Sequence, residues 1–247
     1  MRFLVLFIIL FLCVSDFMSQ SSFYKLFSGN GYDIGKGVAE YPDSSFLVTG
    51  STTSWQGSSQ VVLLKIDSAG TYEWSNNYGG PETDGANRVL YNDVNGVYAV
   101  GYTNSIGEGD YNGLVVHTDA LGNEIWQKSF GETNSWEFFN DAVFANDSSI
   151  LMVGESTGVM TGDQDVYMVR MNADGDTIWT KTIQEFGEGT ASSIIRVQDS
   201  LFIVGGSAYS QDSLIQKGFV MKINMDGDIL WQITAGNLSG IYDVEDV

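Results

Sequence analysis

Aromatic side chains in predicted loops are the residues of this sequence best suited to hold a ligand. A flat ring can stack on the apolar face of a sugar, and Trp and Tyr add a polar edge for a hydrogen bond. Trp136 is the most unusual of them, because it stands near Phe138 and Phe139 where the chain departs from the pattern around it. Packing is the competing role for these rings. The loop aromatics are Trp55, Tyr102, Tyr111, Trp136 and Tyr209, and Trp55, Tyr111 and Trp136 are our candidate binding residues.

Carboxylates in the same predicted loops could hold Ca²⁺, which prefers oxygen ligands. The candidates for metal binding are Asp110, Asp163 and Asp165, with Glu108 close to the first of them. The segments 172–176 and 224–228 superficially resemble calcium loops, but they lack the EF-hand spacing, so turn chemistry explains them better. Apart from this Ca²⁺ hypothesis we predict no cofactor, since no phosphate-binding glycine loop occurs.

No catalytic constellation can be assembled from the sequence. His117 is the only histidine, and it occupies the same repeat position as Lys65, Arg170 and Lys222. A cation at one position of every repeat favours a structural role over catalysis. The one cysteine, Cys13, lies in the N-terminal apolar run. We therefore predict no catalytic residue, because neither a Ser-His-Asp nor a Cys-His arrangement is within reach.

One unit is repeated four times, and its clearest marker is a turn that ends in tryptophan. The turns span 65–74, 117–126, 170–179 and 222–231, with tryptophans 52, 53 and 52 residues apart. An Asp or Asn opens each turn by bonding its own backbone, and a Gly closes it with a positive φ. We predict that each Trp packs between neighbouring sheets. The structural positions are Gly70, Gly122, Gly175, Gly227, Trp74, Trp126, Trp179 and Trp231.

Each unit reads as four short β-strands, which together form the blade of a β-propeller. The second strands end at Gly50, Gly101, Gly154 and Gly205, and the second and third strands are continuously apolar, as in strands buried on both faces. We therefore predict an all-β fold, a β-propeller of four-stranded antiparallel blades with a repeat of about 52 residues. The expected blades cover residues 34–80, 85–132, 137–185 and 190–237, with a truncated fifth blade at 238–247.

Because the strands of each blade are antiparallel, successive connections between them lie alternately on two opposite faces of the propeller. The turns inside each unit that are short and uniform lie on one face, and the longer, more variable loops lie on the other. Binding residues usually occupy variable loops on a repeated scaffold. Any ligand site is expected on this loop face or at the mouth of the central channel.

The turn pattern D-x-x-G-x-x-x-W and the run 162–170 resemble the repeats of bacterial β-propellers found in large exported proteins. Many of those proteins resemble cargo of the Bacteroidetes type IX secretion route. The resemblance covers the chain from about Tyr24 onward and implies the fold more than any function. Residues 23–33 resemble a last strand and the loop that follows it, as in 74–84. The chain therefore reads as an N-terminal fragment whose parent carries further C-terminal blades.

The N-terminus and the charge indicate an exported protein. Residues 1–21 have the parts of a Sec signal peptide, with Arg2 before an apolar run and small residues at Ser19 and Ser21. The propeller repeats then occupy residues 22–247, and no membrane insertion is expected after signal cleavage. A net charge of −20 repels nucleic acid and anionic membranes. We predict a secreted or cell-surface protein.

The function that fits these features is a non-catalytic binding or scaffold propeller whose ligand is a glycan or a protein. The alternative is a fragment of a secreted hydrolase or lyase whose catalytic residues lie outside this chain. A purely architectural spacer within a large surface protein is the third reading.

Overall fold

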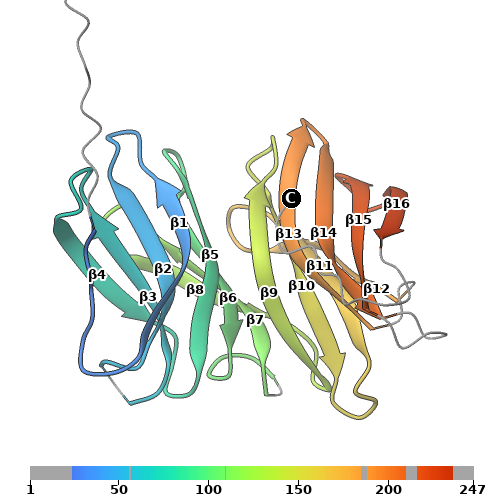
Figure 1. The fold of residues 1–247 in the computed structure, drawn as a ribbon, viewed down its shortest axis with the longest axis horizontal. Helices are drawn as coiled ribbons and strands as arrows, with labels where there is room; N and C mark the ends of the chain where they lie inside the picture. Colours follow the sequence, from blue (N-terminus) through green and yellow to red (C-terminus); the bar gives the residue numbers. More distant parts are fainter. Residues whose placement is uncertain (1–23, 56, 109, 185–187, 210–215, 236–247) are drawn as a thin grey trace, which may run out of the picture.

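The computed structural model describes residues 24–235, apart from 56, 109, 185–187 and 210–215. The described residues form sixteen β-strands in four four-stranded antiparallel sheets, and no helix (Figure 1). The first two sheets are β1 (Asp33–Glu40), β2 (Phe46–Thr52), β3 (Gln60–Ile66) and β4 (Tyr72–Tyr78), then β5 (Asp84–Asn92), β6 (Gly96–Thr103), β7 (Asn112–Thr118) and β8 (Glu124–Phe130). The others are β9 (Ser135–Phe144), β10 (Ile150–Gly158), β11 (Gln164–Met171) and β12 (Thr177–Ile183), then β13 (Gly189–Gln198), β14 (Leu201–Tyr209), β15 (Gln216–Asn224) and β16 (Ile229–Ala235).

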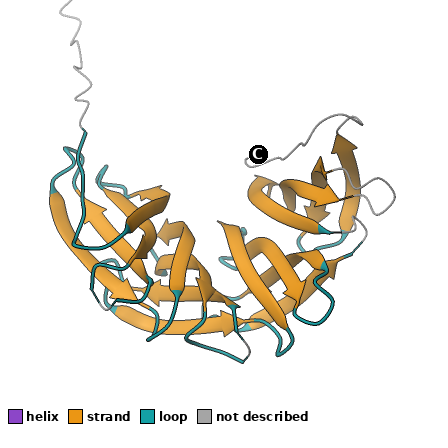
Figure 2. Ribbon diagram, turned by 60° about the horizontal axis from the view of Figure 1, so that its bottom comes forward, coloured by secondary structure: helices purple, strands orange, loops and turns teal. Residues whose placement is uncertain are grey.

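The four sheets stand side by side along an open arc, which is the blade arrangement of a β-propeller (Figure 2). The first strand of each of blades 2 to 4 packs against the preceding sheet, as β5 does on β1, β2 and β3. The predicted all-β propeller of four-stranded blades is confirmed for these units. The signal segment 1–21, Cys13 and the truncated blade at 238–247 lie outside the described residues.

Each pair of neighbouring blades shares one apolar core. Strand β7 shows why the middle strands are apolar throughout. Leu114 and Val116 belong to the core shared with blade 1, whereas Val115 belongs to the core shared with blade 3. Because successive side chains of a strand point to opposite faces, a strand covered on both sides must be apolar at every position.

In each blade, a glycine of the second strand lies opposite a bulge in the first strand. A Cβ on Gly50 would overlap the backbone carbonyl of Ile34, so only glycine fits at this close approach. In the fourth blade this place belongs to Gly206, which pairs with Ala191, and not to the neighbouring Gly205. The expected strand ends at these glycines are wrong, because the second strands continue to Thr52, Thr103, Gly158 and Tyr209. Two adjacent glycines cannot be told apart by spacing alone.

The turns between third and fourth strands take the predicted conformation. The four turn glycines have φ between 74° and 81°, and Asp67 accepts hydrogen bonds from the backbone N–H groups of Ala69 and Thr71. The tryptophan of each of the first three blades lies against the turn glycine of the next blade, in the pairs Trp74–Gly122, Trp126–Gly175 and Trp179–Gly227. Trp231 has no described blade beyond it and is 42% exposed.

The segment before β1 repeats the loop that precedes β5. The N–H of Gly29 donates to Asp33 and that of Gly31 to Ser54. In the next blade the N–H groups of Gly80 and Glu82 make the same bonds to Asp84 and Ser105. Residues 24–28 themselves form no strand.

Candidate functional site

Four aromatic rings of blades 2 and 3 form one cluster on the predicted loop face. Tyr111 lies at its centre, with ring centroids 5.1 Å from Phe138, 6.2 Å from Trp136 and 6.2 Å from Tyr102. Tyr102 also lies 5.5 Å from Phe138. The rings come from the end of β6, the loop before β7 and the start of β9. We call Tyr102, Tyr111, Trp136 and Phe138 the aromatic cluster.

A hydrogen bond holds the exposed member of this cluster in place. The indole N–H of Trp136 donates to Asp110 Oδ2 at 3.1 Å, while 37% of the Trp136 side chain stays exposed. The backbone of Glu137 donates to the carbonyl of Tyr111, which ties β9 to the loop before β7. The structure therefore brings together Trp136, Tyr111 and Asp110, which the sequence singled out for separate reasons.

Trp55 lies elsewhere, at blade 1. It is 58% exposed and lines an apolar cleft of about 760 Å³ between the N-terminal segment and the outward face of blade 1. Leu26 and Phe27 form one wall of this cleft, and Val62 and Leu64 form the other. Trp55 and Trp136 therefore belong to different surfaces.

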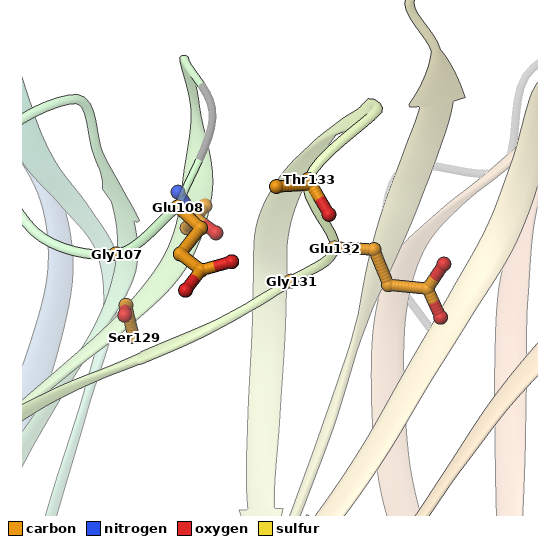
Figure 3. A pocket seen from close by; sticks show the side chains of 7 residues that line it. Gly107, Glu108, Ser129, Gly131, Glu132 and Thr133 are labelled. Carbon is orange, nitrogen blue, oxygen red and sulfur yellow. The ribbon is translucent and has the colours of Figure 1, made fainter.

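A polar cavity of about 380 Å³ opens between the loop before β7 and the segment that joins β8 to β9 (Figure 3). The loop before β7 contributes Gly107 and Glu108, and the segment after β8 contributes Gly131, Glu132 and Thr133. Asn112 of β7 and Ser129 of β8 complete the lining. Carboxylate, amide and hydroxyl groups therefore line this cavity, and no aromatic ring is among its lining residues.

Glu137 lies behind this cavity, and the sequence did not single it out. It is 1% exposed, and its Oε1 accepts hydrogen bonds from the hydroxyls of Ser135 and Ser156. Among the described residues, no side chain donates a hydrogen bond to its Oε2. A Cβ on Gly131 would overlap this oxygen and Asn112 Oδ1, so the carboxyl group lies directly against the cavity wall. Burial raises the pKa of Glu137 above its ordinary value.

In the two preceding blades, an Asp occupies the position that Glu137 has in blade 3. At the same point of blade 2, Asp84 accepts from the hydroxyls of Thr103 and Ser105 and from the N–H of Gly80, which satisfies both of its oxygens. In blade 1, Asp33 is bonded in the same manner, and the hydroxyl of Thr52 lowers its pKa. A Glu in an Asp column was the sequence signal that could have led to this site.

The three metal candidates do not converge in the structure. Asp110 bonds Trp136, and Asp165 accepts from the side chain of Gln184 at 3.3 Å. Asp163 receives a backbone N–H from Gly158 at its carbonyl oxygen. Within the described part of the chain, no three His, Cys, Asp or Glu side chains are grouped so that they could hold a metal ion.

The cation column of the third strands serves packing and turn bonding. Arg170 pairs with Asp147 at 2.6 Å and donates to the carbonyl of Met225 in the next blade at 3.1 Å. His117 is buried and stacks on Tyr98 with centroids 4.2 Å apart. These contacts within and between blades account for the basic residue at this repeat position, and no bound ligand is needed to explain it.

The fold and these contacts define the chain as a β-propeller with a candidate binding surface on its loop face. No family model matches the chain, and the search of curated proteins found no match. Among solved structures, it is similar to the WD40 domain of Neurospora crassa Pan2, with 14% sequence identity and a TM-score of 0.39. That match covers 81% of this chain, which spans 65% of the matched chain's length. The described residues contain no helix long and apolar enough to cross a membrane.

Proposed function

We propose that this protein is a non-catalytic, exported binding module that holds a glycan on the loop face between blades 2 and 3. The observation that carries the proposal is the aromatic cluster with Trp136 as its exposed member. Asp110 fixes the indole from one edge, so the ring is presented in one orientation. A preorganised ring loses less conformational entropy when a ligand stacks on it.

The surroundings of the cluster favour a sugar over an extended protein surface. A cavity of about 380 Å³ on the same loop face is lined by polar groups, including Asn112, Ser129 and Glu108. One sugar ring needs an apolar platform for its axial C–H groups and polar partners for its hydroxyls. The aromatic cluster offers the platform, and Asp110 offers a carboxylate next to Trp136. A protein ligand remains the alternative outcome of the test.

The test is a glycan array followed by calorimetric titration of the best glycan, with and without Ca²⁺. Trp136→Ala should weaken binding roughly tenfold or more, because removal of an aromatic anchor typically costs about 2 kcal/mol of binding free energy. Trp55→Ala is the matched control, since it removes the same ring from another surface and should leave the affinity unchanged. Binding that survives Trp136→Ala would rule out this site, and a loss of affinity on Ca²⁺ removal would support the metal hypothesis.

Export is the second part of the proposal. The apolar run and small residues within residues 1–21, together with a net charge of −20, support it. Expression of the full chain in a bacterial host followed by mass spectrometry of the extracytoplasmic fraction gives the mature N-terminus. A mature chain that begins near residue 22 is expected, and an intact Met1 in the cytoplasm would contradict export.

A further inference from the structure

The first and last sheets stand at the two ends of the open arc, and each presents an apolar face that no described strand covers (Figure 2). On blade 1, Val38 is 59% exposed, whereas Val89, at the same position of blade 2, is 1% exposed. Leu64 lines the cleft beside blade 1, whereas the corresponding Val116 is buried in the core that blades 1 and 2 share. The outer face of blade 1 is therefore one half of an inter-blade core.

The outer face of blade 4 has the side chains of the other half. Ile203 occupies the position that Leu151 has in blade 3, and Val220 occupies that of Met168. Leu151 and Met168 are buried in the core shared with blade 4, while Ile203 and Val220 stay partly exposed. The exposed side chain of Ile233 on β16 extends this apolar face. Each end of the arc thus offers what the other end lacks.

The charges at the two ends match in the same way. The interfaces between blades 2 and 3 and between blades 3 and 4 are each bridged by a Lys–Asp ion pair, of 3.2 and 2.8 Å, and the second of these is Lys181–Asp228. At the ends, Ile233 stands at the Lys position of the fourth strand. Thr71 stands at the Asp position, directly after the turn glycine. Both members of the ion pair are thus replaced by uncharged residues, as expected if these two positions face each other.

We propose that the outer face of blade 4 packs on the outer face of blade 1 of a second copy of this chain, so that two copies close one ring. Twice the four described blades makes eight, which lies within the range of closed propellers. Two identical head-to-tail contacts cover both ends of both copies, because an interface of this kind that closes leaves no free end. Residues 25–28 line the cleft on blade 1 without forming a strand, so β16 of the second copy takes their place. The interface lies apart from the aromatic cluster of blades 2 and 3, so this inference does not depend on glycan binding.

Analytical ultracentrifugation of the chain without residues 1–21 tests the proposal. A dimer and no larger species is expected over a range of concentrations, because a closed ring has no end to which a third copy could add. Ile233→Lys should weaken the dimer roughly tenfold or more, because each ring then holds two lysines with no acidic partner opposite. Thr71→Asp combined with Asp67→Asn copies the Asn172–Asp176 turn of blade 3 and supplies this partner. The chain with all three changes should dimerise within about threefold of the unchanged chain.

Ile178→Lys is the matched control. It introduces the same charge at an exposed isoleucine of β12, away from both end faces, and should leave the dimer unchanged. Thermal unfolding at concentrations where the copies are separate confirms that each variant is folded. A chain without residues 1–28 should dimerise more tightly, since β16 of the second copy no longer has to displace residues 25–28.

Three results would overturn the proposal. A monomer at every concentration would do so and would favour further blades of a longer chain as the cover of both faces. A dimer that Ile178→Lys weakens as much as Ile233→Lys would be held by general electrostatics or by another surface. Species that grow beyond a dimer as the concentration rises would mean that the ring does not close.

Discussion

Trp179→Ala should destabilise the propeller through the contact between blades 3 and 4. The indole of Trp179 lies against Gly227 of the next blade, and its N–H donates to the carbonyl of Met225 at 3.1 Å. The ammonium group of Lys181 lies 5.6 Å from the centre of the ring. One substitution therefore removes packing, a hydrogen bond and a cation–π contact at a single interface.

The expected magnitude follows from the partial burial of this ring. Truncating a fully buried Phe or Trp to Ala costs about 3–5 kcal/mol, and Trp179 is only half-buried. The lost hydrogen bond accounts for about 1 kcal/mol, and the exposed cation–π contact for about 0.5 kcal/mol. We expect the free energy of unfolding to fall by about 2–3 kcal/mol.

Trp231→Ala is the matched control within the same chain. Trp231 occupies the same repeat position and pairs with Lys222 as Trp179 pairs with Arg170. It is 42% exposed and has no described blade ahead of it. Since no described residue of a further blade packs on it, the loss should be below about 1 kcal/mol.

Urea unfolding followed by far-ultraviolet circular dichroism measures both variants without relying on tryptophan fluorescence. The unfolding midpoint of Trp179→Ala should lie clearly below that of Trp231→Ala, with similar slopes. Equal losses in the two variants would refute the reasoning. They would mean that the tryptophan stabilises its own blade and not the interface.

Three further predictions follow from the described contacts. Gly175→Ala should lower the stability of the protein more than Gly162→Ala does. Both glycines have positive φ (81° and 75°), but only a Cβ at Gly175 would meet Trp126. Thermal unfolding compares the two variants, and equal losses of stability would exclude the contact with Trp126. Glu137→Gln should stabilise the protein at about pH 7 and lose this advantage at about pH 4, since burial raises the folded-state pKa and penalises the charged form above the unfolded-state value. Denaturation at both pH values tests this, and a gain that grows as pH falls would contradict it. Ile233→Lys should reduce any self-association of the protein without lowering its stability, because Ile233 is 62% exposed on β16, the last described strand. Analytical ultracentrifugation measures the association, and an unchanged value would show that the exposed surface of β16 is not involved.

Local chemistry was enough to predict the repeated unit. A turn closed by a glycine of positive φ and a strand that is apolar on both faces depend on a few neighbouring residues, so they appear directly in the sequence. The spacing of the tryptophans then implies that the same sheet is built four times. At the glycine pair of blade 4, spacing alone did not distinguish Gly205 from Gly206, and only the pairing of β13 with β14 places Gly206 opposite Ala191.

The candidate site could be predicted only in part. Tyr111 and Trp136 were recognised as unusual loop aromatics, but 25 positions separate them in the sequence, and nothing local indicates that Asp110 bonds the indole of Trp136. Trp55 is also a loop tryptophan with an exposed side chain, yet it lies on blade 1. Glu137 was missed because its hydrogen bonding depends on where its carboxyl group lies in the fold, with one partner, Ser135, on β9 itself and the other, Ser156, on β10.

The sequence by itself determined the all-β class, the four blades and the turn that joins the third strand of each to the fourth, because these depend on alternation and on backbone preferences of single residues. Only the tertiary structure decided which loop side chains meet. Packing blade 3 against blade 2 brings β9 beside the loop before β7, and this contact creates the aromatic cluster. The distance between those side chains is set by how two sheets pack face to face, so it cannot be predicted from either segment alone.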